Sequence, residues 1–213
     1  MNFLAHLHLA EATPESRLGN ILGDFVKGLP WDDRHSEAVW QGIMEHRFLD
    51  AFTDSHEAWK MSRGRLREEN RRYAGIIIDV FYDFFLHRHW PKFSPDIGLE
   101  DFIEDVHRDL ASVIDQAPKD AAAVIGRMIS EQWLLSYGQI EGVADALARV
   151  AASSPNLAKV RGMERELEAN LEGFEVDFLR FYPAAMKRVV IIRTEAVPKR
   201  KIFVTKNLSP DIR

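Results

Sequence analysis

Acidic and imidazole side chains occur at helical spacing within a strongly apolar stretch of the chain. Asp79, Asp83 and His87 follow one another at intervals of four residues. On a helix they would form one stripe, because each step of four turns by about 40°. The residues between them are aliphatic or aromatic, and a buried carboxylate must be paired, protonated or bound to a metal. The stretch therefore predicts a metal site, with an internal salt bridge to Arg47 or Arg72 as the alternative.

A second segment repeats this spacing. His46 and Asp50 lie four residues apart in GIMEHRFLDAFTDSH, and the apolar residues among them predict that this helix packs against the core. Asp54 and His56 follow directly. Asp54 has an equally good role as the cap of the helix that would begin at Ser55. His46 and Asp50 are therefore the stronger candidates for metal ligands.

Two shorter segments near the N-terminus add further donors. Asp24 lies in LGNILGDFVKG, after Gly23 and three residues before Lys27. Gly23 would let another group approach the backbone closely, and Lys27 could reach a phosphate oxygen. His6 and His8 are two residues apart, so on a helix they point about 200° apart and cannot both bind one ion. We predict that His6 is the ligand.

Together these segments supply oxygen and nitrogen donors without sulfur. The predicted metal ligands are His6, Asp24, His46, Asp50, Asp79 and Asp83. Such a set suits Mn²⁺, Mg²⁺ or Fe²⁺ with five or six ligands better than a structural zinc site. A divalent ion there would activate water and hold phosphoryl oxygens during hydrolysis of a phosphate ester. One ion and two ions are both compatible with the pattern.

The elements that must position these side chains are helices. Apolar residues recur at helical spacing throughout, which predicts an all-α, single-domain helical bundle. The expected helices are 2–11, one from the turn at 13–16 to near Gly28, 36–52, 56–70, 71–90, 99–116, 119–137, 139–152 and 156–182. Only Val189–Ile192 and Lys201–Thr205 could be short strands. We expect residues 1–190 to form the domain and residues 191–213 a basic C-terminal tail.

Composition excludes several classes of function. The chain has 213 residues, no cysteine and a net charge of -5, which rules out thiolate chemistry and argues against a general nucleic-acid binder. Its N-terminus does not resemble a secretory signal, and Asp79 and Asp83 interrupt the most apolar run, so we expect a cytoplasmic protein without membrane spans. Two basic segments, Lys60–Arg72 and Lys187–Lys206, predict one acidic partner; solvated helix faces are the alternative.

Several blocks of the sequence, taken in order, resemble the acyl carrier protein phosphodiesterase family. They are MNFLAHLHLA, LGNILGDFVKG, GIMEHRFLDAFTD and RRYAGIIIDVFYDFFLHRHW, followed by SEQWL and LRFYPAAM. The resemblance implies hydrolysis of the phosphodiester that joins 4′-phosphopantetheine to a serine of holo-acyl carrier protein. It also implies a divalent cation, preferably Mn²⁺, and a fold similar to the HD-domain phosphohydrolases.

The same resemblance implies roles for individual residues. Asp24 matches the Asp of the His-Asp doublet of HD-domain proteins and Lys27 matches its later lysine, whereas Gly23 stands where the His would be. His46 or His6 would then supply the missing nitrogen. His87, His89 or His56 could protonate the serine leaving group. The resemblance and the need for a proton donor together give Asp24, Lys27, His87 and His89 as the expected catalytic residues.

The acidic acyl carrier protein would dock on the two basic segments. Two other functions fit the same residues. One is an HD-type nucleotide phosphohydrolase. The other is a non-catalytic helical scaffold that binds acyl carrier protein, in which Asp79 and Asp83 would form ion pairs.

Overall fold

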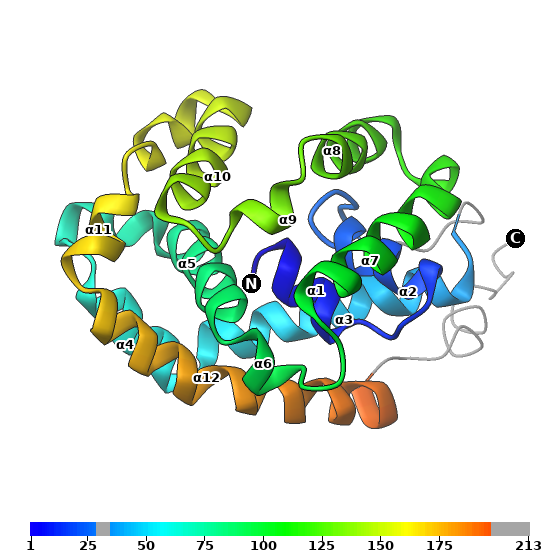
Figure 1. The fold of residues 1–213 in the computed structure, drawn as a ribbon, viewed down its shortest axis with the longest axis horizontal. Helices are drawn as coiled ribbons and strands as arrows, with labels where there is room; N and C mark the ends of the chain where they lie inside the picture. The colour runs from blue at the N-terminus through cyan, green and yellow to red at the C-terminus, as the bar shows by residue number, and fades with distance from the viewer. Residues whose placement is uncertain (29–34, 197–213) are drawn as a thin grey trace, which may run out of the picture.

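The predicted all-α fold is confirmed over residues 1–28 and 35–196, the part of the chain that the computed structural model describes (Figure 1). No strand occurs in these residues. The α-helices are α1 (Phe3–Leu9), α2 (Pro14–Leu22), α3 (Glu37–Ser55), α4 (Glu57–Arg65), α5 (Ala74–Arg88), α6 (Trp90–Phe93), α7 (Leu99–Val113), α8 (Lys119–Ser130), α9 (Trp133–Ser136), α10 (Ile140–Ser153), α11 (Glu164–Ala169) and α12 (Leu171–Ile191). Short 3₁₀ turns η1 (Glu68–Tyr73), η2 (Ile114–Gln116) and η3 (Pro155–Val160) link them, and the π-helical turn η4 (Ile192–Ala196) follows α12.

Polar side chains cap the N-termini of α2, α3 and α4. Thr13 caps α2 by accepting a hydrogen bond from the backbone of Ser16, and Ser36 caps α3 in the same way. His56, whose Nδ1 accepts from Ala58, caps α4. The cap role considered for Asp54 is therefore wrong, because Asp54 lies in the last turn of α3.

An aromatic core holds α5 against α12. The ring centroids of Phe81 and Phe174 are 5.2 Å apart, and Phe178 packs on Tyr82 at 5.5 Å and on Tyr182 at 5.1 Å. These five side chains are fully buried, and each such burial stabilises the fold by roughly 2–3 kcal/mol. In Figure 1, α12 runs along the lower edge and α5 lies between α10 and α12. The apolar helix with the Asp stripe is thus the central helix of the molecule.

Helices α2 and α3 cross at two glycines. A Cβ on Gly42 would lie 2.7 Å from the Ser16 carbonyl oxygen and 2.9 Å from the Gly19 Cα. A Cβ on Gly19 would lie 2.8 Å from the Gly42 Cα. The backbones therefore approach to a distance that only glycine allows, and this sets the position of His46 on α3 relative to the end of α2.

Some predicted elements are divided or changed in the structure. The predicted helix 119–137 breaks at Gln132, which has a left-handed backbone (φ 53°), and the predicted helix 156–182 is divided into η3, α11 and α12. Val189–Ile192 is helical, so the strand considered there is wrong, whereas Lys201–Thr205 lies outside the described residues. The expected domain boundary after residue 190 falls one residue before α12 ends.

None of the described helices is both long and apolar enough to cross a bilayer.

Candidate metal centre

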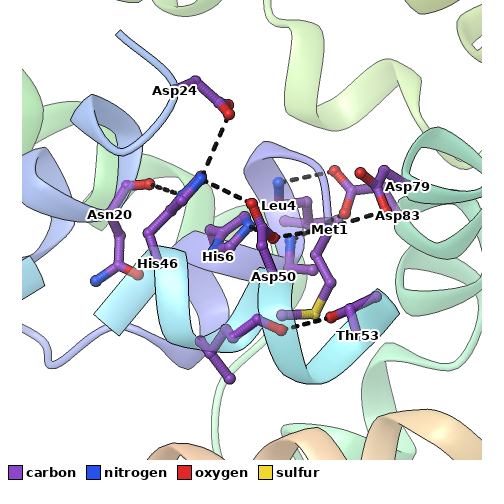
Figure 2. Close-up of polar contacts among 12 residues, drawn as sticks. Met1, Leu4, His6, Asn20, Asp24, His46, Asp50, Thr53, Asp79 and Asp83 are labelled. Carbon is purple, nitrogen blue, oxygen red and sulfur yellow. Dashed lines mark hydrogen bonds and ion pairs between the residues drawn. The ribbon is translucent and has the colours of Figure 1, made fainter. Parts of the chain in front are cut away.

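Four helical segments meet at a cluster of imidazole and carboxylate groups (Figure 2). Asp50 lies at its centre: its Oδ1 is 3.1 Å from His6 Nε2, and its Oδ2 is 3.1 Å from His46 Nε2. Asp24, in the turn after α2, lies 3.4 Å from His46 Nε2. The two imidazole rings stack with centroids 3.9 Å apart. The structure thus brings together His6, Asp24, His46 and Asp50, which come from α1, the end of α2, and α3.

His46 is oriented by the backbone of α2. Its Nδ1 donates to the carbonyl oxygen of Asn20 at 2.7 Å, which turns Nε2 toward the carboxylates of Asp24 and Asp50. A Cβ on Gly23 would overlap the His46 ring and lie 2.8 Å from the His46 Cβ. The absence of a side chain at residue 23 is therefore what leaves room for this imidazole.

The carboxylates control the protonation of the two imidazoles differently. Burial acts to lower the pKa of His46, but hydrogen bonds to Asp24 and Asp50 outweigh it and raise that pKa to about 9. Burial and the neighbouring charge of His46 lower the pKa of His6 to about 4. Although burial alone would raise the pKa of Asp50, the adjacent ammonium and imidazoles hold it well below its usual value. One imidazolium therefore lies between two carboxylates.

Asp79, on α5, faces this cluster from the other side and pairs with an ammonium group. The α-ammonium of Met1 lies 3.1 Å from Asp79 Oδ1 and 3.1 Å from Asp50 Oδ1. Burial raises the pKa of Asp79 to about 6, an effect that the ammonium opposes. The salt bridge considered for Asp79 with Arg47 or Arg72 is not formed. Arg47 instead donates to the carbonyls of Val26 and Gly28.

Asp83 lies one turn further along α5 and holds the first helix. Its two oxygens accept hydrogen bonds from the backbone amides of Leu4 at 2.8 Å and Ala5 at 3.0 Å. These amides belong to the first turn of α1 and have no partner within the helix. Burial raises the pKa of Asp83 to about 7 against the effect of the two hydrogen bonds. Asp83 therefore positions α1, while its role as a metal ligand stays a prediction.

The remaining histidines contact other groups. His8 points away from His6, as predicted from their spacing, and its Nδ1 lies 2.7 Å from the hydroxyl of Tyr182. His87 Nε2 bonds the carbonyl of Leu135 at 3.2 Å, and His89 Nε2 lies 2.6 Å from Glu175. The structure does not bring these side chains into the cluster, and their catalytic roles stay predictions. Lys27 is exposed in the turn that follows Asp24.

Sequence reasoning missed Asn20 and the Met1 ammonium as parts of this site. The contribution of Asn20 that orients His46 is its backbone carbonyl, which every residue has, so its side-chain type gives no signal. The ammonium carries no side-chain pattern either. Asn20 could have been suspected only from its place in the apolar run LGNILG.

The donors present fit a divalent cation. His6, His46 and Asp50 each offer a ligand atom within 4.8 Å of the others, and they are the one such group among the residues described. The carboxylates of Asp24 and Asp50, 3.4 Å and 3.1 Å from His46 Nε2, favour positive charge at this place. The buried Nδ1 of His6 has no hydrogen-bond partner in the described part of the chain. Nitrogen and oxygen donors without sulfur suit Mn²⁺, Mg²⁺ or Fe²⁺.

The fold and the site define an all-helical protein with a cluster of Asp and His side chains of the kind that binds a divalent metal. The sequence model of the family "Acyl carrier protein phosphodiesterase" matches residues 1–185. The chain belongs to this family.

Curated relatives carry the same name. The acyl carrier protein phosphodiesterase of Yersinia enterocolitica is 39% identical over 188 residues, which cover 88% of this chain and 97% of the relative. The protein of that name from Klebsiella pneumoniae is 35% identical over 187 residues (88% and 96%), and one from Escherichia coli is 36% identical over 186 residues (87% and 96%). No solved structure matches the chain.

Proposed function

We propose that this protein is a divalent-cation-dependent phosphodiesterase that releases 4′-phosphopantetheine from the serine of holo-acyl carrier protein. The convergence of His6, His46 and Asp50, with Asp24 at the rim, carries the proposal. Family membership supports the substrate class, because the relatives are named acyl carrier protein phosphodiesterases. Mn²⁺ is the cation that we propose.

The residues divide into those that hold the cation and those that meet the phosphate. His6, His46, Asp50 and Asp24 would hold the ion, with Asp79 close by. The ion would lower the pKa of water and offset charge on the phosphoryl oxygens. Lys27, three residues after Asp24, is exposed and would pair with a phosphate oxygen. The carbonyl of Asn20 fixes the orientation of the His46 ring, so that its Nε2 would be available to hold the cation.

Docking of the carrier protein must occur at the rim of the site. The scissile phosphate is attached directly to the serine, so no flexible arm separates the carrier protein from the metal ligands. The Asp24 side chain is 58% exposed, which makes the turn after α2 the open side of the cluster. Lys27 would therefore contact the carrier protein or its phosphate.

The basic segment Lys60–Arg72 would add long-range attraction to the docking. Three of its six cations form ion pairs within the protein: Arg65 pairs with Asp177, Arg67 with Glu166 and Lys60 with Glu57. Arg63 is exposed and has no ion pair within the described ranges. Residues 197–206, half of the second segment Lys187–Lys206, lie outside the described residues. The proposed contribution of both segments is electrostatic steering of an acidic partner.

The test is hydrolysis of purified holo-acyl carrier protein, followed by intact-protein mass spectrometry. With Mn²⁺ present, we expect the loss of the phosphopantetheine mass, and chelation of the metal should prevent it. Asp24→Ala should lower the rate by at least about a hundredfold, more than substitution of a residue that only supports a metal ligand. Because the Asp24 side chain is largely exposed, the helical circular-dichroism signal should remain unchanged.

The matched control is Asp145→Ala, an exposed acid on α10, which should retain wild-type activity. An unmodified substrate in the presence of bound metal would refute the proposed reaction. A small-nucleotide panel run alongside would then reveal a nucleotide phosphohydrolase. If wild-type protein contained no stoichiometric metal and only bound the carrier protein, it would be a scaffold.

A further inference from the structure

A buried network of hydrogen bonds connects the candidate ligand His46 with Arg193, near the end of the described residues. Asn20, whose carbonyl accepts from His46, is itself fully buried. Its side-chain amide donates to Glu45 Oε1 at 3.1 Å and to the Ser16 carbonyl at 3.1 Å. Glu45 is also buried. The two bonds from one amide fix the orientation of Asn20 relative to α3.

Arg193, in η4, is the last residue of this hydrogen-bond network. Its Nε lies 2.6 Å from Glu45 Oε2, and its Nη2 lies 3.0 Å from Glu45 Oε1. This geometry is bidentate, which makes the pair directional as well as charged. Glu45 would otherwise be a buried carboxylate with only an amide to compensate it, which is costly. Arg193 therefore holds Glu45 in the rotamer that bonds Asn20.

The guanidinium of Arg193 also contacts α1, the helix that carries His6. Arg193 Nη2 donates to the carbonyl of Leu9, the last residue of α1. That carbonyl is one of the unpaired acceptors at a helix C-terminus, where positive charge is favoured. One side chain thus connects α1, which carries His6, with α3, which carries His46. Residue 193 lies beyond the segment that the family model matches.

We propose that Arg193 and Glu45 are positioning residues: they fix Asn20 and the end of α1, and thereby hold His46 and His6 in the geometry that binds the cation. The proposal rests on the proposed function of these imidazoles as metal ligands. Neither Arg193 nor Glu45 contacts the metal or the substrate. They act through Asn20 and Leu9.

The decisive measurement is hydrogen exchange of the His46 Nδ1 proton in metal-free, full-length protein, observed by ¹⁵N-resolved NMR. In the wild type this proton is buried against Asn20 and should exchange slowly. In Arg193→Ala and in Glu45→Gln it should exchange at least about tenfold faster. Titration with Mn²⁺ by calorimetry should show a dissociation constant raised by about tenfold to a hundredfold, as when other residues that hydrogen-bond a metal ligand are replaced.

The matched control is Arg65→Ala. Arg65 forms a bidentate pair with buried Asp177, at 2.6 Å and 3.2 Å, between α4 and α12. Its side chain is 26% exposed, against 28% for Arg193. Arg65→Ala should lower the melting temperature yet leave His46 exchange and Mn²⁺ affinity unchanged. Arg193→Gln replaces the alanine variant if that variant does not fold.

The outcomes separate this inference from the proposed function. Unchanged His46 exchange in folded Arg193→Ala and Glu45→Gln would overturn the positioning role, whatever the metal affinity. An equal effect of Arg65→Ala on His46 exchange would overturn it as well, because general loosening would then be the cause. If wild-type protein did not bind Mn²⁺, the metal proposal would fail. The exchange measurement would still test the positioning role, because it is made on metal-free protein.

Discussion

Gly23 matters because of the side chain that it lacks. The imidazole of His46 fills the space that a Cβ at residue 23 would enter. The backbone of Gly23 is helical (φ -51°), so an alanine there would meet no backbone strain. Any effect of a substitution must therefore come from contact with His46.

Gly23→Ala should displace the His46 ring and weaken the proposed metal site. We expect the dissociation constant for Mn²⁺ to rise at least about tenfold, as when a supporting contact of a ligand is lost, and turnover of holo-acyl carrier protein to fall in parallel. Calorimetry and the mass-spectrometric assay measure the two effects. Gly64→Ala, in α4 with open space around it, is the control. Undiminished Mn²⁺ affinity in Gly23→Ala would contradict the packing argument.

Among individual residues, the sequence predicted the side chains of the site better than the backbone groups that support them. The spacing of His46 and Asp50, and the opposite directions of His6 and His8, follow from helical geometry alone, and the structure has both features. The carbonyl of Asn20 and the pairing of Glu45 with Arg193 depend on tertiary contacts across 26 and 148 residues. No periodic pattern contains such contacts.

The crossing of α2 and α3 makes the site sensitive to helix packing. Both helices contribute to the cluster, α2 through Asn20 and the turn with Asp24, and α3 through His46 and Asp50. Their separation is set by Gly19 and Gly42. A change at this contact should therefore affect stability and metal binding together.

Gly42→Ala should destabilise the protein by about 1–3 kcal/mol, because its Cβ would meet the Ser16 carbonyl and neither backbone can yield cheaply. Chemical denaturation measures the free energy of unfolding. The matched variant is Gly126→Ala, in the interior of α8 with nothing near its Cβ. That substitution should stabilise the protein by about 0.5–1 kcal/mol, because alanine favours helix. Equal effects of the two substitutions would show that the crossing is not closely packed.

Helix identity was more predictable than helix ends. Regular apolar spacing indicated α3, α5 and α7 correctly, since each presents a continuous face to the core. The break at Gln132 was not predicted, because a left-handed residue other than glycine has no composition signal. Val189–Ile192 was considered as a strand because β-branched residues follow one another there. Its packing as the end of α12 overrides that propensity.

Away from the polar cluster, the molecule contains a half-buried histidine, His8, that is held neutral. His8 lies between Trp90 and Tyr182, and its burial lowers its pKa from 6.5 to about 4. In the unfolded chain His8 takes up a proton near its ordinary pKa. The unfolded state therefore binds more protons between about pH 6.5 and pH 4, and folding stability must fall as the pH falls through that window.

His8→Gln should make the folding stability less dependent on pH. Above about pH 7 the titration of His8 does not contribute to stability. Below about pH 7 the free energy of unfolding of the wild type should fall by at most about 1.4 kcal/mol per pH unit more than that of the variant. Urea denaturation at several pH values between 4 and 7.5, with a chelator present, measures the difference. Other histidines titrate in both proteins and cancel. Parallel pH profiles would show that His8 is not held neutral in the folded state.

The hydrogen bonds from Leu4 and Ala5 to Asp83 have a consequence for folding during translation. Helix α1 has only 7 residues, and helices shorter than roughly 12 residues are barely stable alone in water. Its anchor lies 79 residues further along the chain. During translation, His6 therefore has no fixed position until α5 has left the ribosome, and the nascent N-terminal segment should be unable to capture a metal ion before then.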